Sequence, residues 1–302
     1  MIEDQNQIST YFKNSVLISD HILKRNYIPC KLKYKNRYSY IQTYEIVSSF
    51  LNTINKEYYK EFHNKIKGNK IKILERNIIP IYDEKDENIK IPYTQTLQDS
   101  YNLIHELFHS LNFPQQKSQL HYKYTEFISI LSEILLEEYL NQNHFDETYY
   151  ESNNRLIWLN SISTSTLYLN DIYRNMRFNK KINNEKLYYE FIKKYNGANI
   201  LPERTLEIIN EPSFEIIDNC KYIVGITLAY KLKNNLNYDE LEKMLIKLND
   251  NINIYTEEEF YNEIGFKKSK DGVLDYRSLN DLYKSFDMEC YNNFNKVYIK
   301  KR

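Results

Sequence analysis

The sequence predicts a mainly α-helical fold with one small β-sheet directly before a helix that carries two histidines. Three observations support this prediction. Apolar residues recur at helical spacing over most of the 302 residues. Between residues 71 and 91 the pattern changes to short apolar runs that are typical of strands. No internal repeat, low-complexity segment or linker divides the chain, so we expect a single domain over residues 1–302.

The N-terminal part, residues 1–68, is predicted to form helices, and residues 69–93 a small sheet. The helices are expected at 6–29 and 38–67, and Gly68 is a suitable C-cap for the second. Short strands are expected at 71–74, 78–82 and 89–91, with a charged turn at 83–88. Such a sheet matters for function, because an extended peptide can add to a sheet edge through backbone hydrogen bonds.

Residues 94–142 are predicted to contain two helices that hold the functional motif. Thr96 and Asp99 form a capping box before the first helix, apolar residues follow at helical spacing, and Pro114 stops it. The second helix is expected at 122–141. The C-terminal helical part, residues 143–302, is predicted to contain helices at 155–176, 186–195, 216–232, 238–248, 256–264 and 278–286.

Composition and charge exclude several classes of partner. The 41 basic and 41 acidic residues balance, so no electrostatic argument favours nucleic acid or an anionic membrane. No apolar run approaches the roughly 20 residues that span a bilayer, and the polar N-terminus does not resemble a secretory signal. Cys30, Cys220 and Cys290 lack metal-ligand spacing and are consistent with a reducing compartment. We therefore expect a cytoplasmic protein.

The motif that carries chemistry is His105-Glu106-Leu107-Phe108-His109. Two histidines four residues apart lie on the same face of a helix, so both imidazoles can reach one metal ion. A glutamate directly after the first histidine lies beside that ion, where it can act as a base on a bound water. A catalytic zinc keeps three protein ligands and leaves its fourth position to water. The motif therefore predicts one Zn²⁺ on His105 and His109, with Glu106 as the base.

The third ligand has to come from elsewhere in the chain. The metzincin pattern is excluded, because Gln115 stands where it requires histidine. The downstream candidates are Glu126, Glu133, Glu137, Glu138 and His121. Glu126 lies in an apolar helix and Glu133 falls close to the same face, so one could bind the metal while the other holds a ligand histidine by a hydrogen bond. The alternative is that these are solvated helix acids, which we expect of Glu137 and Glu138.

Several segments resemble the thimet oligopeptidase and oligoendopeptidase F zinc peptidases. Residues 93–110, YTQTLQDSYNLIHELFHS, are similar to that family's zinc-helix segment, YTGTLxDVFTLAHELGHS. Glu126-Phe127-Ile128-Ser129 followed by Glu133 is similar to its third-ligand segment, AEVASTxNE. Residues 187–197, LYYEFIKKYNG, and residues 221–225, KYIVG, resemble its LYxELLKKYYG and KYATG segments. Weaker similarity runs from about residue 31 to residue 290.

The resemblance implies a helical zinc metallopeptidase of the gluzincin type that hydrolyses peptide bonds in short peptides. It implies that the zinc ligands are His105, His109 and Glu126, and that Glu106 is the general base. Glu133 and Ser129 correspond to residues that support the ligands. Tyr222 corresponds to a tyrosine that hydrogen-bonds the substrate carbonyl. The alternative for Tyr222 is an ordinary packing role among the 30 tyrosines of the chain.

The sequence also departs from the family pattern. Phe108 stands where the family has glycine, Glu126 follows His109 by 17 positions, which is fewer than in the family, and no histidine follows His144. Family members are roughly twice as long, so the resemblance implies that the chain lacks their N-terminal half. Three functions stay open: an active oligopeptidase, a zinc-binding but inactive peptide-binding or regulatory protein, and a half-enzyme completed by self-association or a partner chain. We favour the first, because a pure binder has no need of Glu106.

Overall fold

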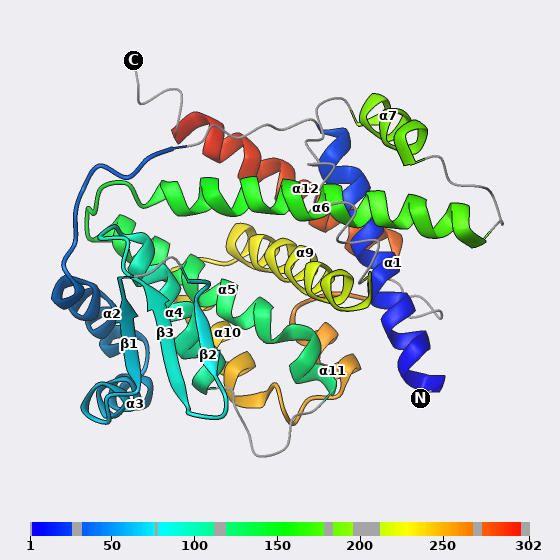
Figure 1. The fold of residues 1–302 in the computed structure, drawn as a ribbon. Helices are drawn as coiled ribbons and strands as arrows, with labels where there is room; N and C mark the ends of the chain where they lie inside the picture. Colours follow the sequence, from blue (N-terminus) through cyan, green and yellow to red (C-terminus); the bar gives the residue numbers. More distant parts are fainter. Residues whose placement is uncertain are drawn as a thin grey trace. The chain divides into compact units, whose positions relative to one another are not determined.

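A computed structural model describes residues 2–25, 32–75, 78–111, 119–177, 184–195, 212–267 and 274–296. These residues form a mainly helical structure with one small sheet, which confirms the predicted fold class (Figure 1). The elements are α1 (Ile2–Lys24), α2 (Tyr40–Ile54), α3 (Lys56–Lys67), β1 (Ile71–Leu74), β2 (Ile81–Asp83), β3 (Asn88–Pro92), α4 (Gln98–Leu111), α5 (Gln119–Gln142), α6 (Tyr149–Arg177), α7 (Asn184–Lys194), α9 (Pro212–Asn235), α10 (Tyr238–Asn251), α11 (Glu257–Glu263) and α12 (Tyr276–Phe294).

The chain divides into two compact units. The motif unit consists of residues 32–153 and 232–261, and it contains the predicted metal ligands. The terminal unit consists of residues 1–31, 154–231 and 262–302. The expectation that residues 1–302 form a single catalytic domain stays a prediction.

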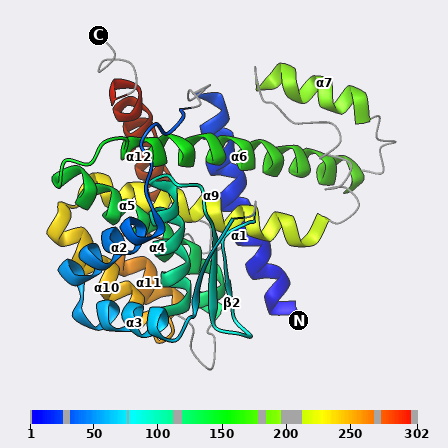
Figure 2. The same cartoon turned by 60° about the vertical axis from the view of Figure 1, so that its left-hand side comes forward.

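The core of the motif unit is built around α4 and α5. Helix α4 packs against α5, α2 and β3 (Figure 2). Apolar side chains at intervals of three and four residues share one face of a helix, so each helix buries a continuous stripe. The stripes consist of Leu103, Ile104, Leu107 and Phe108 on α4, and Phe127, Leu131, Ile134 and Leu135 on α5, all fully buried. This packing fixes the rotation of both helices and therefore the direction of their remaining side chains.

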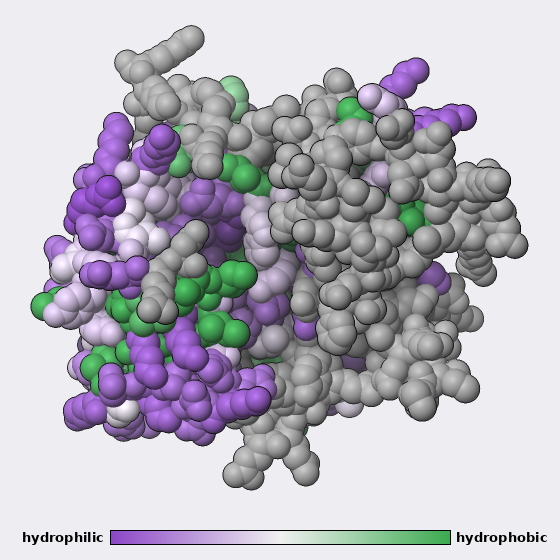
Figure 3. Space-filling view, in the orientation of Figure 1, coloured by the Kyte–Doolittle hydropathy of each residue, from purple (hydrophilic) through white to green (hydrophobic). Residues whose placement is uncertain are grey.

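The sheet has the order β1-β3-β2. β1 runs parallel to β3, and β2 runs antiparallel to it after a turn at residues 84–87. Ile89 and Ile91 of β3 are fully buried and Lys90 between them is half-buried, which is the alternation that a strand with one buried face requires. β2 is an edge strand. Ile81 within it is 51% exposed, and Ile79 just before it is 86% exposed. Hydrophobic surface is visible where the strands lie (Figure 3).

The helix predicted at 38–67 is in fact two helices, because Asn55 breaks it. Asn55 is extended, with φ −159° and ψ 122°. Its side chain accepts hydrogen bonds from the backbone N–H groups of Glu57 at 2.7 Å and Tyr58 at 3.2 Å. A short amide side chain satisfies the free N–H groups of a new helix start, and this competes with continuing the old helix. Gly68 caps α3 as predicted.

Other boundaries also differ from the predictions. The first helix ends at Lys24 rather than residue 29, and β2 begins at Ile81 rather than residue 78. The predicted capping box of Thr96 and Asp99 is replaced by bonds of Asp99 to residues before Thr96. The buried Asp99 carboxylate accepts from the backbone N–H groups of Thr94 and Gln95, both at 3.0 Å, whereas the Thr96 hydroxyl meets the Thr94 hydroxyl at 2.7 Å. Pro114 lies outside the described residues.

In the terminal unit, α1 packs against α12. The His21 ring stacks on Tyr283 with ring centroids 4.1 Å apart, and its Nε2 lies 3.1 Å from Oδ1 of Asp287. In the described part of the chain, we find no helix with both the length and the apolar character that a bilayer crossing requires.

Phe108 fills space between helices. Its ring is fully buried and meets Tyr58 of α3 edge to face, with centroids 5.6 Å apart. We expect Phe108→Ala to lower the free energy of unfolding by about 3–5 kcal/mol, because it leaves a cavity. Chemical denaturation of metal-free protein would measure this. Phe294→Ala is the control, since that ring is 48% exposed. Equal losses in both variants would contradict a packing role for Phe108.

Candidate metal centre

His105 and His109 both project from the same face of α4. Their ring centroids are 4.7 Å apart, and the two Nε2 atoms are 3.0 Å apart. The side chains are 13% and 16% exposed, so they lie near the surface but mostly out of water. Leu107 and Phe108 point into the core from the opposite side of the helix and hold this orientation. The i, i+4 spacing thus brings the Nε2 atoms of both imidazoles close to one point.

Glu126 of α5 completes the group. Its Oε2 lies 3.3 Å from Nε2 of His105 and 3.4 Å from Nε2 of His109. That oxygen is buried, and neither approach has hydrogen-bond geometry. The three ligand atoms lie within 4.8 Å of one another, so these residues could hold a metal ion. A buried carboxylate oxygen without a hydrogen bond is costly unless a cation satisfies it.

The spacing of these atoms can be compared with that of a real metal site. Tetrahedral zinc with bonds of 2.0–2.1 Å places its ligand atoms about 3.3–3.4 Å apart. The distances from Oε2 of Glu126 to the two Nε2 atoms match this value. The distance of 3.0 Å between the two Nε2 atoms is slightly shorter. Two imidazoles with one carboxylate form a ligand set that suits zinc and other transition ions better than calcium or magnesium, which prefer oxygen ligands. The residues therefore fit a metal ion of this class.

The outward nitrogens of both histidines are held by hydrogen bonds. Nδ1 of His105 lies 2.5 Å from Oε1 of Glu133, and Nδ1 of His109 lies 3.1 Å from the Thr125 hydroxyl and 3.3 Å from the Ser129 hydroxyl. A carboxylate only accepts, so Nδ1 of His105 donates, and this arrangement directs the Nε2 lone pair of a neutral ring toward the metal position. Glu133 and Ser129, which the sequence analysis expected to support the ligands, make these contacts to His105 and His109. Thr125 was missed, although its spacing of four residues from Ser129 would have put it on the same face.

The pKa values of two ligands are shifted in opposite directions. Burial opposes the protonation of His105, but the carboxylates of Glu126 and Glu133 outweigh it and raise its pKa well above the ordinary value. Burial likewise opposes ionisation of Glu126, but His109 and His105 outweigh it and lower its pKa. Without metal the histidine therefore tends to hold a proton, and a metal ion must displace that proton to bind.

Glu106 lies next to the ligands on α4. It is 6% exposed, and its charge contributes to the raised pKa of His105. In the part of the chain that the structure describes, no side chain forms a hydrogen bond or ion pair with Glu106. A buried carboxylate beside a metal position can accept a proton from a water there.

The remaining candidates for the third ligand are placed differently. Glu137 is fully buried, so the prediction of a solvated acid is wrong for it. Its Oε1 lies 3.7 Å from Nζ of Lys233, a residue in the last turn of α9. The Glu138 side chain is 33% exposed and also lies 3.7 Å from that ammonium group. The side chain of His121 lies outside the described residues.

Tyr222 belongs to the terminal unit, on α9. Its ring packs against Trp158 of α6, with centroids 4.2 Å apart. This contact agrees with the alternative given in the sequence analysis, that Tyr222 has an ordinary packing role. The proposed contact with a substrate carbonyl stays a prediction.

Glu133 gives a test of how the ligands are oriented. We expect Glu133→Gln to weaken zinc binding by about 10–100-fold, because the amide accepts more weakly from Nδ1 and no longer favours the correct ring orientation. Zinc affinity can be measured by competition with a chromogenic chelator. Glu138→Gln is the matched control on the same helix and should bind zinc as the wild type does. Unchanged affinity in Glu133→Gln would contradict the supporting role.

Comparisons with known proteins support the fold and add little beyond it. No protein-family model matches the chain, and no curated protein matches it. The chain is structurally similar to a crystal structure of a "putative peptidase" from Chlamydophila abortus, with a TM-score of 0.55 and 15% sequence identity. The match covers 96% of this chain and 54% of that one, so the chain spans about half the length of the matched protein. At this identity the likeness concerns the fold.

Proposed function

We propose that this protein is a zinc-dependent metallopeptidase that hydrolyses peptide bonds in short peptides. One observation carries the proposal: Nε2 of His105, Nε2 of His109 and Oε2 of Glu126 converge to within 3.0–3.4 Å, with a buried glutamate next to them. The similarity of fold to a structure described as a "putative peptidase" agrees with this function. So does the similarity of the motif segments to the thimet oligopeptidase and oligoendopeptidase F zinc peptidases.

The residues of the site have separate tasks in this proposal. His105, His109 and Glu126 would hold the zinc ion. When bound, zinc supplies Lewis-acid chemistry and lowers the pKa of water toward ~7. Glu106 accepts the proton of the attacking water and then delivers it to the leaving amine. Glu133, Thr125 and Ser129 orient the two imidazoles through their Nδ1 atoms.

The sheet offers a place for an extended peptide. β2 is an edge strand of the described sheet, and α4 packs against both β2 and β3. A peptide that adds to this edge would form backbone hydrogen bonds irrespective of its sequence, and its side chains could contact exposed apolar residues such as Ile81, which is 51% exposed. This supports a peptide substrate, and it leaves the cleavage preference open.

The proposal is tested by removing and restoring the metal. Purified protein is treated with a chelator, dialysed, and incubated with a mixed library of short peptides with and without one equivalent of Zn²⁺. We expect cleavage products by mass spectrometry only with the metal. The untreated protein and a zinc-only control without protein are run alongside. A zinc-loaded protein that cleaves no peptide would favour the inactive binding protein or the half-enzyme, and light scattering during the same experiment would reveal self-association.

A further inference from the structure

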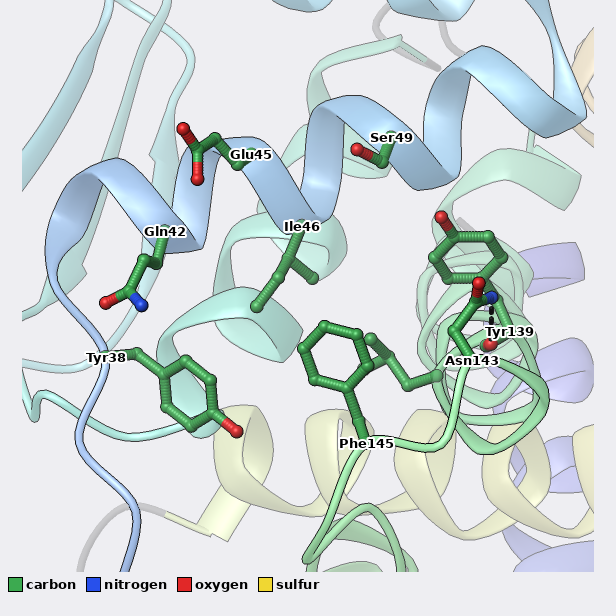
Figure 4. A pocket seen from close by; sticks show the side chains of 9 residues that line it. Tyr38, Gln42, Glu45, Ile46, Ser49, Tyr139, Asn143 and Phe145 are labelled. Carbon is green, nitrogen blue, oxygen red and sulfur yellow. Dashed lines mark hydrogen bonds between the residues drawn. The ribbon is translucent and has the colours of Figure 1, made fainter.

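A second site lies at the far end of α5 from the metal centre. It is a cavity of about 260 Å³ between α2, the end of α5 and the loop that follows α5 (Figure 4). Glu126 and Tyr139 both lie on α5, and at 1.5 Å per residue the helix separates them by about 20 Å. The cavity is therefore distinct from the metal centre, and ligand binding in it is independent of the proposed peptidase activity.

Aromatic rings form a large part of the cavity wall. Tyr38, Tyr139 and Phe145 line it from three separate segments, with Ile46 of α2 between them (Figure 4). The Tyr139 ring is held in place by Phe50, with centroids 5.6 Å apart. The π faces of aromatic rings attract cations, and several rings around one hollow give this attraction from more than one direction.

The charge at this site is negative. Glu45 is the one residue with a charge at neutral pH among those that line the described cavity, and it is exposed on α2 at its rim. The carboxylates of Glu147 and Asp146 act electrostatically on Tyr38. Burial raises the pKa of the Tyr38 hydroxyl, and these two carboxylates raise it further. The same negative field that disfavours a tyrosinate would favour a bound cation.

The loop that forms one wall is held in a defined conformation. His144 and Glu147 have positive φ angles of 58° and 66°, which non-glycine residues seldom adopt. The Glu147 carboxylate accepts hydrogen bonds from the backbone N–H groups of Lys35 at 2.8 Å and Asn36 at 3.2 Å. These bonds tie the loop with Phe145 to the segment with Tyr38. The wall is thus preformed, which reduces the entropy that ligand binding would cost.

We propose that this cavity binds an alkylammonium group, with its chain against Ile46 and Phe145 and its charge among the tyrosine rings, in the negative field to which the exposed Glu45 contributes. The amide of Asn143 donates through Nδ2 to the carbonyl oxygen of Tyr139 at 2.8 Å, and its Oδ1 can accept from the ammonium. The volume of about 260 Å³ admits a short alkyl chain with a single head group. A carboxylate, an amide oxygen and aromatic faces provide acceptors and π surface without a competing cation in the lining.

The probe for this site is n-butylammonium, titrated into isotopically labelled protein and followed by NMR. We expect saturable shifts at residues of the cavity, with n-butanol, the neutral compound of similar shape, binding at least about tenfold more weakly. Glu45→Gln should weaken n-butylammonium binding about fivefold, because it removes one exposed charge. Phe145→Leu should weaken it by a similar factor while keeping the apolar volume.

Glu258→Gln is the matched control, since it removes the same charge from an exposed position on α11. It should bind the probe as the wild type does. Equal binding of n-butanol and n-butylammonium, or unchanged binding in Glu45→Gln, would overturn the proposal. Binding is read without any assay of cleavage, so a failure here is separate from a failure of the peptidase proposal.

The same titration distinguishes two sources of the alkylammonium group. One arm uses n-butylammonium as a free amine, and the other uses a lysine-centred tripeptide with blocked termini. Tighter binding of the tripeptide identifies a basic side chain of a peptide as the ligand, and tighter binding of the amine identifies a small metabolite-like amine. Either outcome supports the site. Absence of saturable shifts with both probes at tens of millimolar would overturn it.

Discussion

Glu106→Gln is expected to retain zinc and lose peptide cleavage, with kcat reduced by about 10²–10⁴-fold. Glutamine has the same shape as glutamate, so this 6% exposed position keeps its packing. It cannot accept the proton of the attacking water, and it cannot return one to the leaving amine. The ligand atoms of His105, His109 and Glu126 are unchanged, so metal binding should persist. The reaction is measured on the mixed peptide library, at equal metal content in wild type and variant.

The design separates loss of the base from loss of fold or metal. Metal content is determined by mass spectrometry of the intact protein and by atomic emission, and the fold by circular dichroism. Glu258→Gln carries the same change at an exposed position and should cleave at the wild-type rate. Cleavage by Glu106→Gln at the wild-type rate would show that this glutamate is not the base. A cleaving wild type would also exclude the inactive binding protein.

Glu126→Gln is expected to lose zinc. It replaces the charged oxygen that lies 3.3 and 3.4 Å from the two imidazoles with a neutral amide, which is a poorer ligand. Zinc affinity should fall by more than the factor of about 10–100 expected when only the supporting Glu133 is changed. The order of affinity is therefore wild type, then Glu133→Gln, then Glu126→Gln.

Thermal unfolding provides an independent measurement of the same effect. A metal that binds only the folded protein stabilises it by about 2.7 kcal/mol when its free concentration is one hundred times Kd. Wild-type protein should therefore melt at a higher temperature with added zinc, and Glu126→Gln should show no such rise at the same concentration. Glu138→Gln, changed on the same helix, should respond like the wild type. Stoichiometric zinc in Glu126→Gln would contradict its role as a ligand.

The sequence alone was sufficient for the local parts of the site. The positions of His105, Glu106 and His109 on one helix follow from an apolar pattern with helical spacing, and the i, i+4 spacing alone brings two imidazoles to one face. The fold class and the small sheet before α4 were also predictable, because they depend on periodicity over short windows. Where a local polar side chain competed with that pattern, as Asn55 does, the helix boundary was missed.

The tertiary structure decided which residues meet across helices. From spacing alone, Glu126 and Glu133 were both candidates for the third ligand. The packing of α5 on α4 places Glu126 against the Nε2 atoms and Glu133 against Nδ1 of His105. It also brings Thr125 to His109 and buries Glu137, which the sequence had suggested was solvated. Helical periodicity tells which residues share a face, but the identity and register of the neighbouring helix depend on side-chain packing between segments distant in sequence.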